Sequence, residues 1–215
     1  MTMPTFLRFG LIGLGRFGVH YARLLQNIEG VSFYAAAARD EKSFTAARVP
    51  SNTKRFSDGI ALIDDPFLDC VIIATPATTH AELVGAALNA GKHVLVEKPM
   101  TATLEEADMI AGLAASVKRT FMVGHQYLYN DYIRELKQQL DRGVFGKIAY
   151  VFAEHFYPGP IRKDIGCFWE TATHELAMID FLFSRPHLLN AQVKMVDIVQ
   201  RGYDDFTQAL LSFKN

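Results

Sequence analysis

Three glycines near the start of the chain have the spacing of a loop that binds a dinucleotide pyrophosphate. The stretch GLGRFG places Gly13, Gly15 and Gly18 in G-x-G-x-x-G order, after an apolar run and before a helical pattern. There the first glycine allows a tight turn, the second lets the backbone approach the pyrophosphate, and the third lets the helix pack against the strand. The N–H groups at the start of the helix would face the anion. We expect Arg16 and Phe17, which complete the loop, to contribute to the same cofactor site.

The residues that follow the second apolar run predict which dinucleotide binds. An NAD site usually places an acid there, which accepts a hydrogen bond from the ribose 2′-hydroxyl. The run ends in AAAARD, so the position expected for the acid is Ala38, and Arg39 follows it. A planar guanidinium suits a 2′-phosphate, which predicts NADP, with NAD possible. The alternative is that the position of the acid lies two residues later, in which case Asp40 is the acid and NAD is the cofactor.

A lysine after another apolar run could stabilise charge on a reacting oxygen. The run HVLVE (93–97) leads into Lys98 and a proline. A lysine at the carboxyl end of a parallel strand lies where open α/β sheets bind ligands. Hydride transfer changes the charge on the oxygen of the alcohol or carbonyl, and a fixed ammonium donor stabilises it. An exposed lysine at a strand–loop junction is the alternative.

An acid and a histidine lie four residues apart in the stretch FWETATHEL. Glu170 and His174 share one face if the stretch is helical. A histidine suits proton transfer because its pKa lies near working pH. The spacing alone leaves two interpretations open, a solvated charge pair and half of an active site.

These side chains need a frame of strands and helices, and the first half of the chain supplies one. Predicted strands span 7–14, 31–38, 70–75, 93–97 and 120–124, and predicted helices span 16–26, 80–90 and 104–117. Gly91 is expected to end the second helix, and Thr103 with Glu106 predicts a capping box on the third. Such alternation predicts a parallel, doubly wound Rossmann sheet, here over residues 1–124, the NAD(P)-binding domain.

The pattern changes after residue 124 and predicts a second, smaller α+β domain over 125–215. The expected elements are helices at 132–143 and 168–184 and strands at 147–157, 190–200 and 206–213. This domain would bind substrate and take part in oligomerisation.

Composition excludes several classes of protein. The 215 residues carry a net charge of −1, and 50% are hydrophobic and 21% charged, as in soluble globular proteins. The basic residues form no patch for nucleic acid, and no apolar run reaches the roughly 18 residues of a membrane span. Cys70 and Cys167 show neither metal-ligand spacing nor a disulfide framework. These features predict a cytoplasmic protein without a metal site, and Cys70 as a small core residue.

Two further motifs carry a resemblance to a known family. The stretch ATPATTH (74–80) follows one strand and VEKPM (96–100) follows the next, after the glycine loop. This combination resembles the Gfo/Idh/MocA oxidoreductases, the glucose–fructose oxidoreductase and inositol dehydrogenase family. The resemblance implies that Glu97 and Lys98 lie beside the nicotinamide, with Lys98 on the reacting oxygen and the Lys98–Pro99 bond in the cis form. It also implies that Thr75, Pro76 and His80 line the cofactor, although His80 is better explained as a cap of the following helix.

The second half matches the family more loosely. The stretch IRKDIGCFWETATHELAMIDFLF is similar to a segment of members that act on nucleotide-linked sugars. His174 then corresponds to the acid/base that takes the substrate proton, with Arg162 and Glu170 as further substrate contacts. Glu170 replaces the usual aspartate, so its carboxylate reaches one methylene further. His155 is a weaker candidate for the same pocket.

The resemblance implies an NAD(P)-dependent dehydrogenase or reductase that acts on a sugar, polyol or similar cyclic alcohol. A non-sugar carbonyl or a dihydrodiol is a further possible substrate. The alternative is a dinucleotide-binding sensor or regulatory protein without turnover, since fold does not determine function. Complete members are longer, so we expect a second domain whose sheet is cut short. Members commonly form oligomers through that sheet, which implies a homo-oligomer here.

Overall fold

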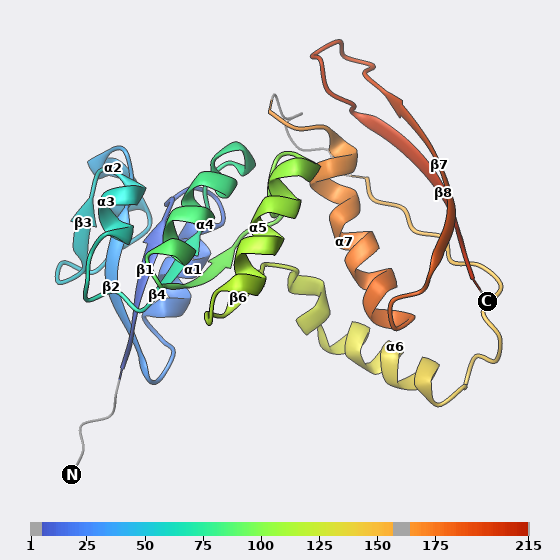
Figure 1. Cartoon of the computed structure of the whole chain (residues 1–215), viewed down its shortest axis with the longest axis horizontal. Coiled ribbons are helices and arrows are strands. Elements are labelled where there is room, and N and C mark those ends of the chain that lie inside the picture. Colours follow the sequence, from blue (N-terminus) through green and yellow to red (C-terminus); the bar gives the residue numbers. More distant parts are fainter. Residues whose placement is uncertain (1–5, 157–163, 215) are drawn as a thin grey trace. The chain divides into compact units, whose positions relative to one another are not determined.

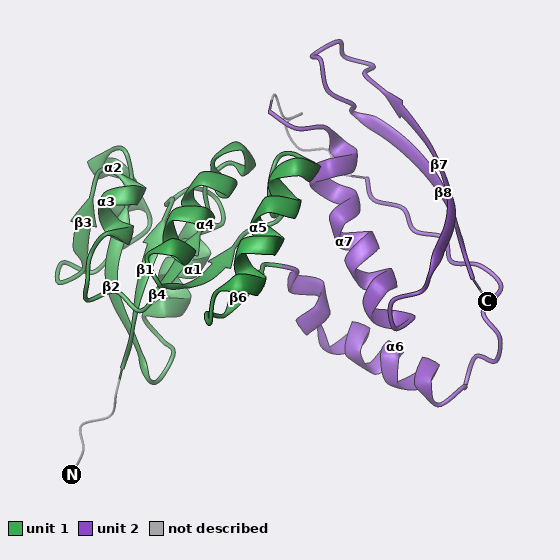
Figure 2. Cartoon of the chain, viewed as in Figure 1, with its two compact units in different colours: residues 1–124 green, residues 125–215 purple. Residues whose placement is uncertain are grey.

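The computed structural model describes residues 6–156 and 164–214 (Figure 1). The chain divides into two compact units, residues 1–124 and 125–215 (Figure 2). The first unit holds a six-stranded sheet and the second a two-stranded sheet with helices.

All pairings in the six-stranded sheet are parallel, in the order β3-β2-β1-β4-β5-β6. Its strands are β1 (Leu7–Ile12), β2 (Val31–Ala37), β3 (Lys54–Phe56), β4 (Cys70–Ile73), β5 (His93–Val96) and β6 (Phe121–Val123). Every residue of β4 is buried, as the continuous apolar run predicted. The order reverses between β1 and β4, so the crevice where open α/β sheets bind ligands lies at the carboxyl ends of these two strands.

Helices cover both faces of this sheet because consecutive strand residues point to opposite sides. Val71 and Ile73 of β4 pack in one cluster with α3, α4 and α5, whereas Ile72 packs in a second cluster with α1 and α2. The helices are α1 (Gly18–Leu25), α2 (Glu41–Ala46), α3 (Gly59–Ile63), α4 (His80–Asn89) and α5 (Leu104–Ser116). The doubly wound sheet predicted for this half is therefore confirmed.

Local signals set the ends of several helices as expected. Thr103 and Glu106 form the predicted capping box at α5. Gly91, with φ of 73°, follows the last turn of α4. The short elements α2, α3 and β3 were not predicted. Asp40 and Asp58 cap α2 and α3 through their side chains, which is the local signal that marks both starts.

The second unit contains η2 (Gln126–Tyr129), α6 (Asp131–Asp141), α7 (Cys167–Leu182), β7 (Leu188–Val196) and β8 (Phe206–Phe213). β7 and β8 pair in antiparallel fashion. The strand predicted at 147–157 is wrong over its described part, because residues 147–156 form no strand. A strand requires a neighbour that shares its backbone hydrogen bonds, and within residues 6–156 and 164–214 no strand pairs with this segment.

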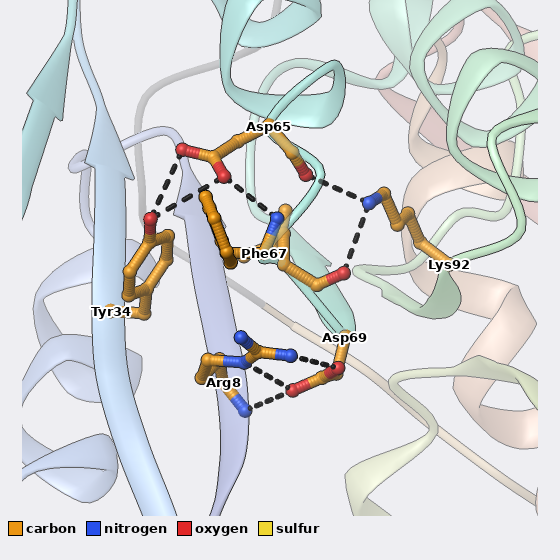
Figure 3. A network of polar contacts seen from close by, with 7 residues as sticks. Arg8, Tyr34, Asp65, Phe67, Asp69 and Lys92 are labelled. Carbon is orange, nitrogen blue, oxygen red and sulfur yellow. Dashed lines mark hydrogen bonds and ion pairs between the residues drawn. The ribbon is translucent and has the colours of Figure 1, made fainter.

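A polar network joins the loops at the amino ends of the sheet (Figure 3). Arg8 donates to Asp69 through its backbone N–H (2.8 Å) and through Nε and Nη2 (both 2.9 Å). Asp65 accepts from the Tyr34 hydroxyl at 3.2 Å and from Lys54 at 2.6 Å. The buried Lys92 ammonium donates to the carbonyl oxygens of Asp65 (2.8 Å) and Leu68 (3.0 Å). The bonds of Asp65 and Lys92 satisfy polar groups that would otherwise be buried without partners, whereas Arg8 and Asp69 are only partly buried.

Cys70 is 6% exposed and lies in the core, as predicted. Burial raises the pKa of its thiol to about 11. Across 6–156 and 164–214, no helix is long and apolar enough to cross a membrane.

Candidate active site

The glycine loop runs from β1 into α1 with a geometry that only glycine allows at two positions. Gly13 has φ of 92°, and a Cβ there would lie 2.6 Å from the carbonyl oxygen of Ala74. A Cβ at Gly18 would lie 2.0 Å from the carbonyl oxygen of Gly13. At Gly15 a Cβ would meet nothing within 4 Å. The loop is thus closed against the protein at Gly13 and Gly18 and open at Gly15, as a loop that approaches a pyrophosphate must be.

The start of α1 is suited to an anion. Its first turn contains no acidic residue and its N-cap position, Phe17, makes no side-chain capping bond. The N–H groups and dipole of a helix N-terminus attract negative charge. Arg16 and Phe17 are both exposed on this loop. These residues fit a dinucleotide pyrophosphate, with backbone N–H groups as the donors.

The end of β2 presents Arg39 and Asp40 next to each other, both exposed. The Asp40 carboxylate accepts a hydrogen bond from the Ser43 amide at 2.9 Å and so caps α2. Asp40 therefore already has a structural role, whereas Arg39 extends into solvent at the end of the strand.

The loop after β4 contains the Thr75-Pro76 motif and leads into α4. The Thr79 hydroxyl donates to Thr75 Oγ1 at 2.7 Å, and Thr75 is partly exposed. His80 is buried at 1% exposure, with Nε2 2.9 Å from the carbonyl oxygen of Thr75 and Nδ1 2.8 Å from that of Pro99. His80 thus ties the loop after β4 to the loop after β5. The expectation that it caps α4 is wrong, because α4 has no side-chain cap and the ring points to these carbonyls.

Both partners of the His80 ring are hydrogen-bond acceptors. A neutral imidazole donates through only one nitrogen, so the imidazolium is the form that satisfies both carbonyls. Burial nevertheless lowers the pKa of His80, and although the carbonyl oxygens of Pro99 and Thr75 act in the opposite direction, the net direction is downward, which favours the neutral ring.

The loop after β5 holds Glu97, Lys98 and Pro99. Glu97 is 8% exposed, and its carboxylate accepts from the Tyr21 hydroxyl at 2.7 Å through Oε1 and from the Lys98 amide at 3.1 Å through Oε2. The Lys98–Pro99 bond is cis, as expected. Lys98 itself is partly exposed at the carboxyl end of β5. The ammonium group of Lys98 is thus carried by a loop that is fixed on both sides of the lysine, by the bonds of Glu97 before it and by the contact of His80 with Pro99 after it.

In the second unit, His174 lies in a cluster of rings. It is 6% exposed in the middle of α7. Tyr127 packs edge-on against it, with ring centroids 4.8 Å apart and planes at 89°. His155 stacks nearly parallel to it at 6.5 Å and 13°. The His155 Nδ1 lies 2.9 Å from Oε1 of Glu175. The cluster combines two imidazoles, a phenol and a carboxylate, which are side chains that enzymes use for general acid–base catalysis.

Glu170 lies in the first turn of α7, one turn before His174. A carboxylate at this position is favourable because it faces the positive end of the helix. The helix start is held by Asp204, whose carboxylate accepts from the Phe168 amide at 2.8 Å. A Cβ at Gly166 would lie 1.6 Å from Asp204 Oδ1, so only glycine fits where this carboxylate reaches the helix.

The residues predicted for the site fall into both units. The cofactor candidates before residue 124 all follow the carboxyl ends of β1, β2, β4 or β5. Glu170 and His174 belong to the second unit. Arg162 lies outside the described residues. The sequence did not predict Tyr21, Tyr127 or Glu175. The partner of Tyr21 is Glu97, and those of Tyr127 and Glu175 are His174 and His155, all of which lie at least 20 positions away in the sequence. In the described parts of the chain, no group of three or more His, Cys, Asp or Glu side chains could hold a metal ion.

Comparison with known protein families gives two matches. The model of an oxidoreductase family with an NAD-binding Rossmann fold, Gfo/Idh/MocA, matches residues 7–125. The model of a Gfo/Idh/MocA C-terminal domain matches residues 133–215.

Individual relatives point the same way. The chain is 38% identical to the uncharacterized oxidoreductase YdgJ of Escherichia coli K12 over 218 residues, covering 96% of this chain and 62% of the relative. It is 28% identical to a myo-inositol 2-dehydrogenase of Thermotoga maritima over 182 residues, covering 82% of this chain and 54% of that protein. The chain therefore spans between about half and two thirds of the length of these relatives.

A solved structure shares the fold. The myo-inositol dehydrogenase of Lactobacillus casei in complex with NAD(H) and myo-inositol superposes with a TM-score of 0.78 and 25% identity, covering 97% of this chain and 64% of that chain.

Proposed function

Because the chain belongs to the Gfo/Idh/MocA family of oxidoreductases with an NAD-binding Rossmann fold, we propose that it transfers a hydride between a nicotinamide dinucleotide and a cyclic polyol or related alcohol. The observation that carries this proposal is the placement of Lys98. Its loop follows β5 at the ligand-binding edge of a sheet whose first turn is an open glycine loop. Several of the relatives are named as inositol dehydrogenases, which supports a cyclic polyol as the substrate class.

We assign the cofactor to the glycine loop and to the loops after β2, β4 and β5. Gly13, Gly15 and Gly18, with Arg16 and Phe17, would hold the pyrophosphate, and Thr75 and Pro76 would line the nicotinamide half. Arg39 would pair with a 2′-phosphate, so we propose a preference for NADP. Its exposure at the end of β2, beside an aspartate already used as a helix cap, supports this preference.

The chemistry divides between two side chains. When bound, the nicotinamide accepts or supplies the hydride. Lys98 would donate to the substrate oxygen and stabilise the charge that develops there. His174 would take the proton of the hydroxyl in the oxidation direction and return it in reduction. Glu170, and Arg162 in the undescribed segment, would contact substrate hydroxyls. No metal is needed for these steps.

The test is an absorbance assay at 340 nm with NADP+ and NAD+ against myo-inositol, scyllo-inositol, sugars and other polyols. We expect turnover by the wild-type chain, and a loss of about 10²- to 10³-fold in kcat for Lys98→Met, the scale of one lost charge-stabilising donor. Lys118→Met, an exposed lysine in the same unit, is the matched control. Dinucleotide binding, followed by fluorescence, should survive in both variants.

The alternative function is a sensor that binds the dinucleotide without turnover. It would be favoured if the chain binds NADP+ or NAD+ but no member of the panel changes the absorbance. Full activity in Lys98→Met would instead contradict the role given to that lysine.

We also propose a cytoplasmic homo-oligomer that forms through the β7–β8 sheet. Both cysteines are free, as suits a reducing compartment. Large apolar side chains are exposed on this sheet, among them Leu189, Met195 and Leu210. Light scattering after size-exclusion chromatography measures the mass in solution, and a monomer at micromolar concentration would contradict the assembly.

A further inference from the structure

A buried carboxylate stands directly behind the lysine to which the proposed function assigns the reacting oxygen. Glu97 precedes Lys98 at the end of β5 and is 8% exposed. Its Oε2 accepts the backbone N–H of Lys98 at 3.1 Å. The carboxylate therefore acts on the position of the lysine backbone, from which the ammonium-bearing side chain extends.

The other oxygen of Glu97 connects this loop to the glycine loop. Oε1 accepts the Tyr21 hydroxyl at 2.7 Å, across 76 positions of sequence. Tyr21 lies in α1, the helix that begins at Gly18 of the glycine loop. The contact thus joins the helix that would hold the pyrophosphate to the residue before Lys98.

The hydroxyl of Tyr21 is a permanent donor. Burial raises the pKa of Tyr21, and the hydrogen bond to Glu97 raises it further. The phenol therefore stays protonated at any pH at which the protein would work. A hydrogen bond to a charged acceptor is also stronger than one between neutral groups.

The surroundings leave Glu97 little freedom to move. Gly124 follows β6, and a Cβ at this position would lie 3.3 Å from Glu97 Cδ and Oε1. Its amide donates to the carbonyl oxygen of Val96 at 2.8 Å. On the far side of Lys98, His80 lies 2.8 Å from the carbonyl oxygen of Pro99. The loop is thus held before and after the lysine.

We propose that Tyr21 is a positioning residue for Lys98, which it holds in place through Glu97. Tyr21 touches neither the substrate nor the reacting atoms in this assignment. Its hydroxyl orients the Glu97 carboxylate, and that carboxylate fixes the Lys98 amide. The catalytic part of the assignment rests on the proposed function, whereas the positioning part concerns the loop alone.

The test compares two tyrosine-to-phenylalanine variants. Tyr21→Phe removes the hydroxyl that reaches Glu97. Tyr34→Phe removes a hydroxyl that donates to Asp65 at 3.2 Å in the network at the opposite edge of the sheet. The two changes are chemically identical, each deletes a bond to a buried acid of the same unit, and only one leads to Lys98.

The first readout is hydrogen–deuterium exchange of a peptide that covers residues 97–100, measured without cofactor. Because a peptide loses the label of its first residues, the peptide begins several residues before Glu97, and the label at Lys98 is isolated by comparison with an overlapping peptide that ends at Glu97; Pro99 contributes no amide. We expect Tyr21→Phe to speed this exchange by about 10-fold, the effect of losing roughly 1.4 kcal/mol of protection. Tyr34→Phe should leave the exchange of this peptide within 2-fold of wild type, because the lost bond to Asp65 is distant from Lys98 and shares no partner with it. Glu97→Gln, which replaces one acceptor oxygen by a donor, should also speed exchange and serves if Tyr21→Phe does not fold.

The second readout is the split between kcat and KM with NADP+ and myo-inositol, or with the panel member that gives turnover. We expect Tyr21→Phe to lower kcat by about 10-fold with KM within 2-fold, because positioning acts on the transition state. Unchanged exchange at Lys98 in Tyr21→Phe overturns the proposal, whether or not the protein turns over. Faster exchange with full kcat overturns the catalytic role of the positioning. Faster exchange in a protein without any turnover supports the positioning and counts only against the proposed function.

Discussion

At the end of β2, two neighbouring side chains have different freedom to bind a ligand. Asp40 is committed to the cap of α2, through a bond of 2.9 Å from the Ser43 amide. To accept a ribose hydroxyl it would have to give up capping bonds, and loss of a cap costs about 0.5–2 kcal/mol. Arg39 is exposed and meets no such penalty. This difference is the physical basis for the proposed preference for NADP.

Replacement of Arg39 by alanine should weaken NADP+ binding and leave NAD+ binding nearly unchanged. A hydrogen bond to a charged group contributes about 1.5–3 kcal/mol, so we expect the Kd for NADP+ to rise roughly 10- to 100-fold. Titration calorimetry with each dinucleotide measures both values. Arg23→Ala, another exposed arginine of the same unit, is the control. Equal losses for the two dinucleotides would rule out contact with a 2′-phosphate.

The sequence predicts a site residue when the groups that fix its geometry are close to it along the chain, and misses it when those groups are distant in sequence. The glycine loop was predictable because its geometry is set within six residues. Tyr21 could not be recognised, since a tyrosine in an amphipathic helix is usually a core residue and its partner Glu97 is distant in the chain. His80 was assigned to a helix start that it does not cap, because the carbonyl oxygens that it contacts belong to two loops.

At the scale of elements, the start of α7 depends on a residue from another part of its unit. Asp204 precedes β8, and its carboxylate accepts from the Phe168 amide (2.8 Å), from the Thr207 hydroxyl (2.8 Å) and from Cys167 Sγ (3.1 Å). Burial raises the pKa of Asp204, but these donors outweigh it and the net direction is downward. The helix that carries Glu170 and His174 is therefore anchored by the β7–β8 hairpin.

The change Asp204→Ala should loosen α7 at its first turn. We expect a loss of about 1–2 kcal/mol in the free energy of unfolding of the second unit, the scale of a lost helix cap, and faster amide exchange near Phe168. Urea unfolding and hydrogen exchange measure the two effects. Asp205→Ala is the matched control, because that carboxylate caps Ile198 and Val199 amides in the hairpin and not the helix. Unchanged exchange at the start of α7 would show that the helix does not need this anchor.

Elements long enough to show a repeating pattern of apolar residues could be predicted from the sequence. Elements that exist, or fail to form, because of a pairing strand elsewhere in the chain could not. The strand predicted at 206–213 matches β8 residue for residue. The three-residue β3 is too short to show an alternating pattern, and it exists because it pairs with β2. The segment 147–156 has the composition of a strand but no described strand pairs with it. Propensity favours an extended backbone, and only pairing makes it a strand.

At the scale of the whole molecule, acids that anchor the sheet make stability depend on pH. The hydrogen bonds from Arg8 hold the pKa of Asp69 below its ordinary value, although burial acts against this. Burial also raises the pKa of Asp65, but bonds from Lys54 and the Phe67 amide bring it below its usual range. An acid whose pKa is lower in the folded state stabilises that state above its unfolded pKa of about 4. This stabilisation is lost as the pH falls through the folded pKa.

We therefore expect the free energy of unfolding of the first unit to decline modestly as the pH falls below about 6.5, because the lowered pKa of buried His80 makes the unfolded state bind that proton first. It should fall further as the pH drops below about 4, where the acids lose their stabilising bonds. Asp69→Asn should lower stability at pH 7 and reduce the steepness of the acid limb, because the bond from Arg8 then no longer depends on a titrating group. Urea denaturation between pH 3 and pH 7 measures both features. An acid limb as steep in the variant as in wild type would contradict the assignment.

The network at the amino ends of the strands and the candidate site at their carboxyl ends are separated by the full length of the sheet. From Asp69 before β4 to Thr75 after it there are six residue steps, which span about 20 Å where the chain is extended. Free-energy effects at sites this far apart are usually additive. Protein engineers could therefore accumulate stabilising substitutions around Arg8, Asp65 and Lys92, and then use that reserve to tolerate destabilising changes in the loops that contact ligands. The sheet would thus separate the residues that keep the chain stable from those that determine its substrates. Substitutions at the carboxyl ends of the strands could then change the range of substrates while the amino ends keep the chain folded.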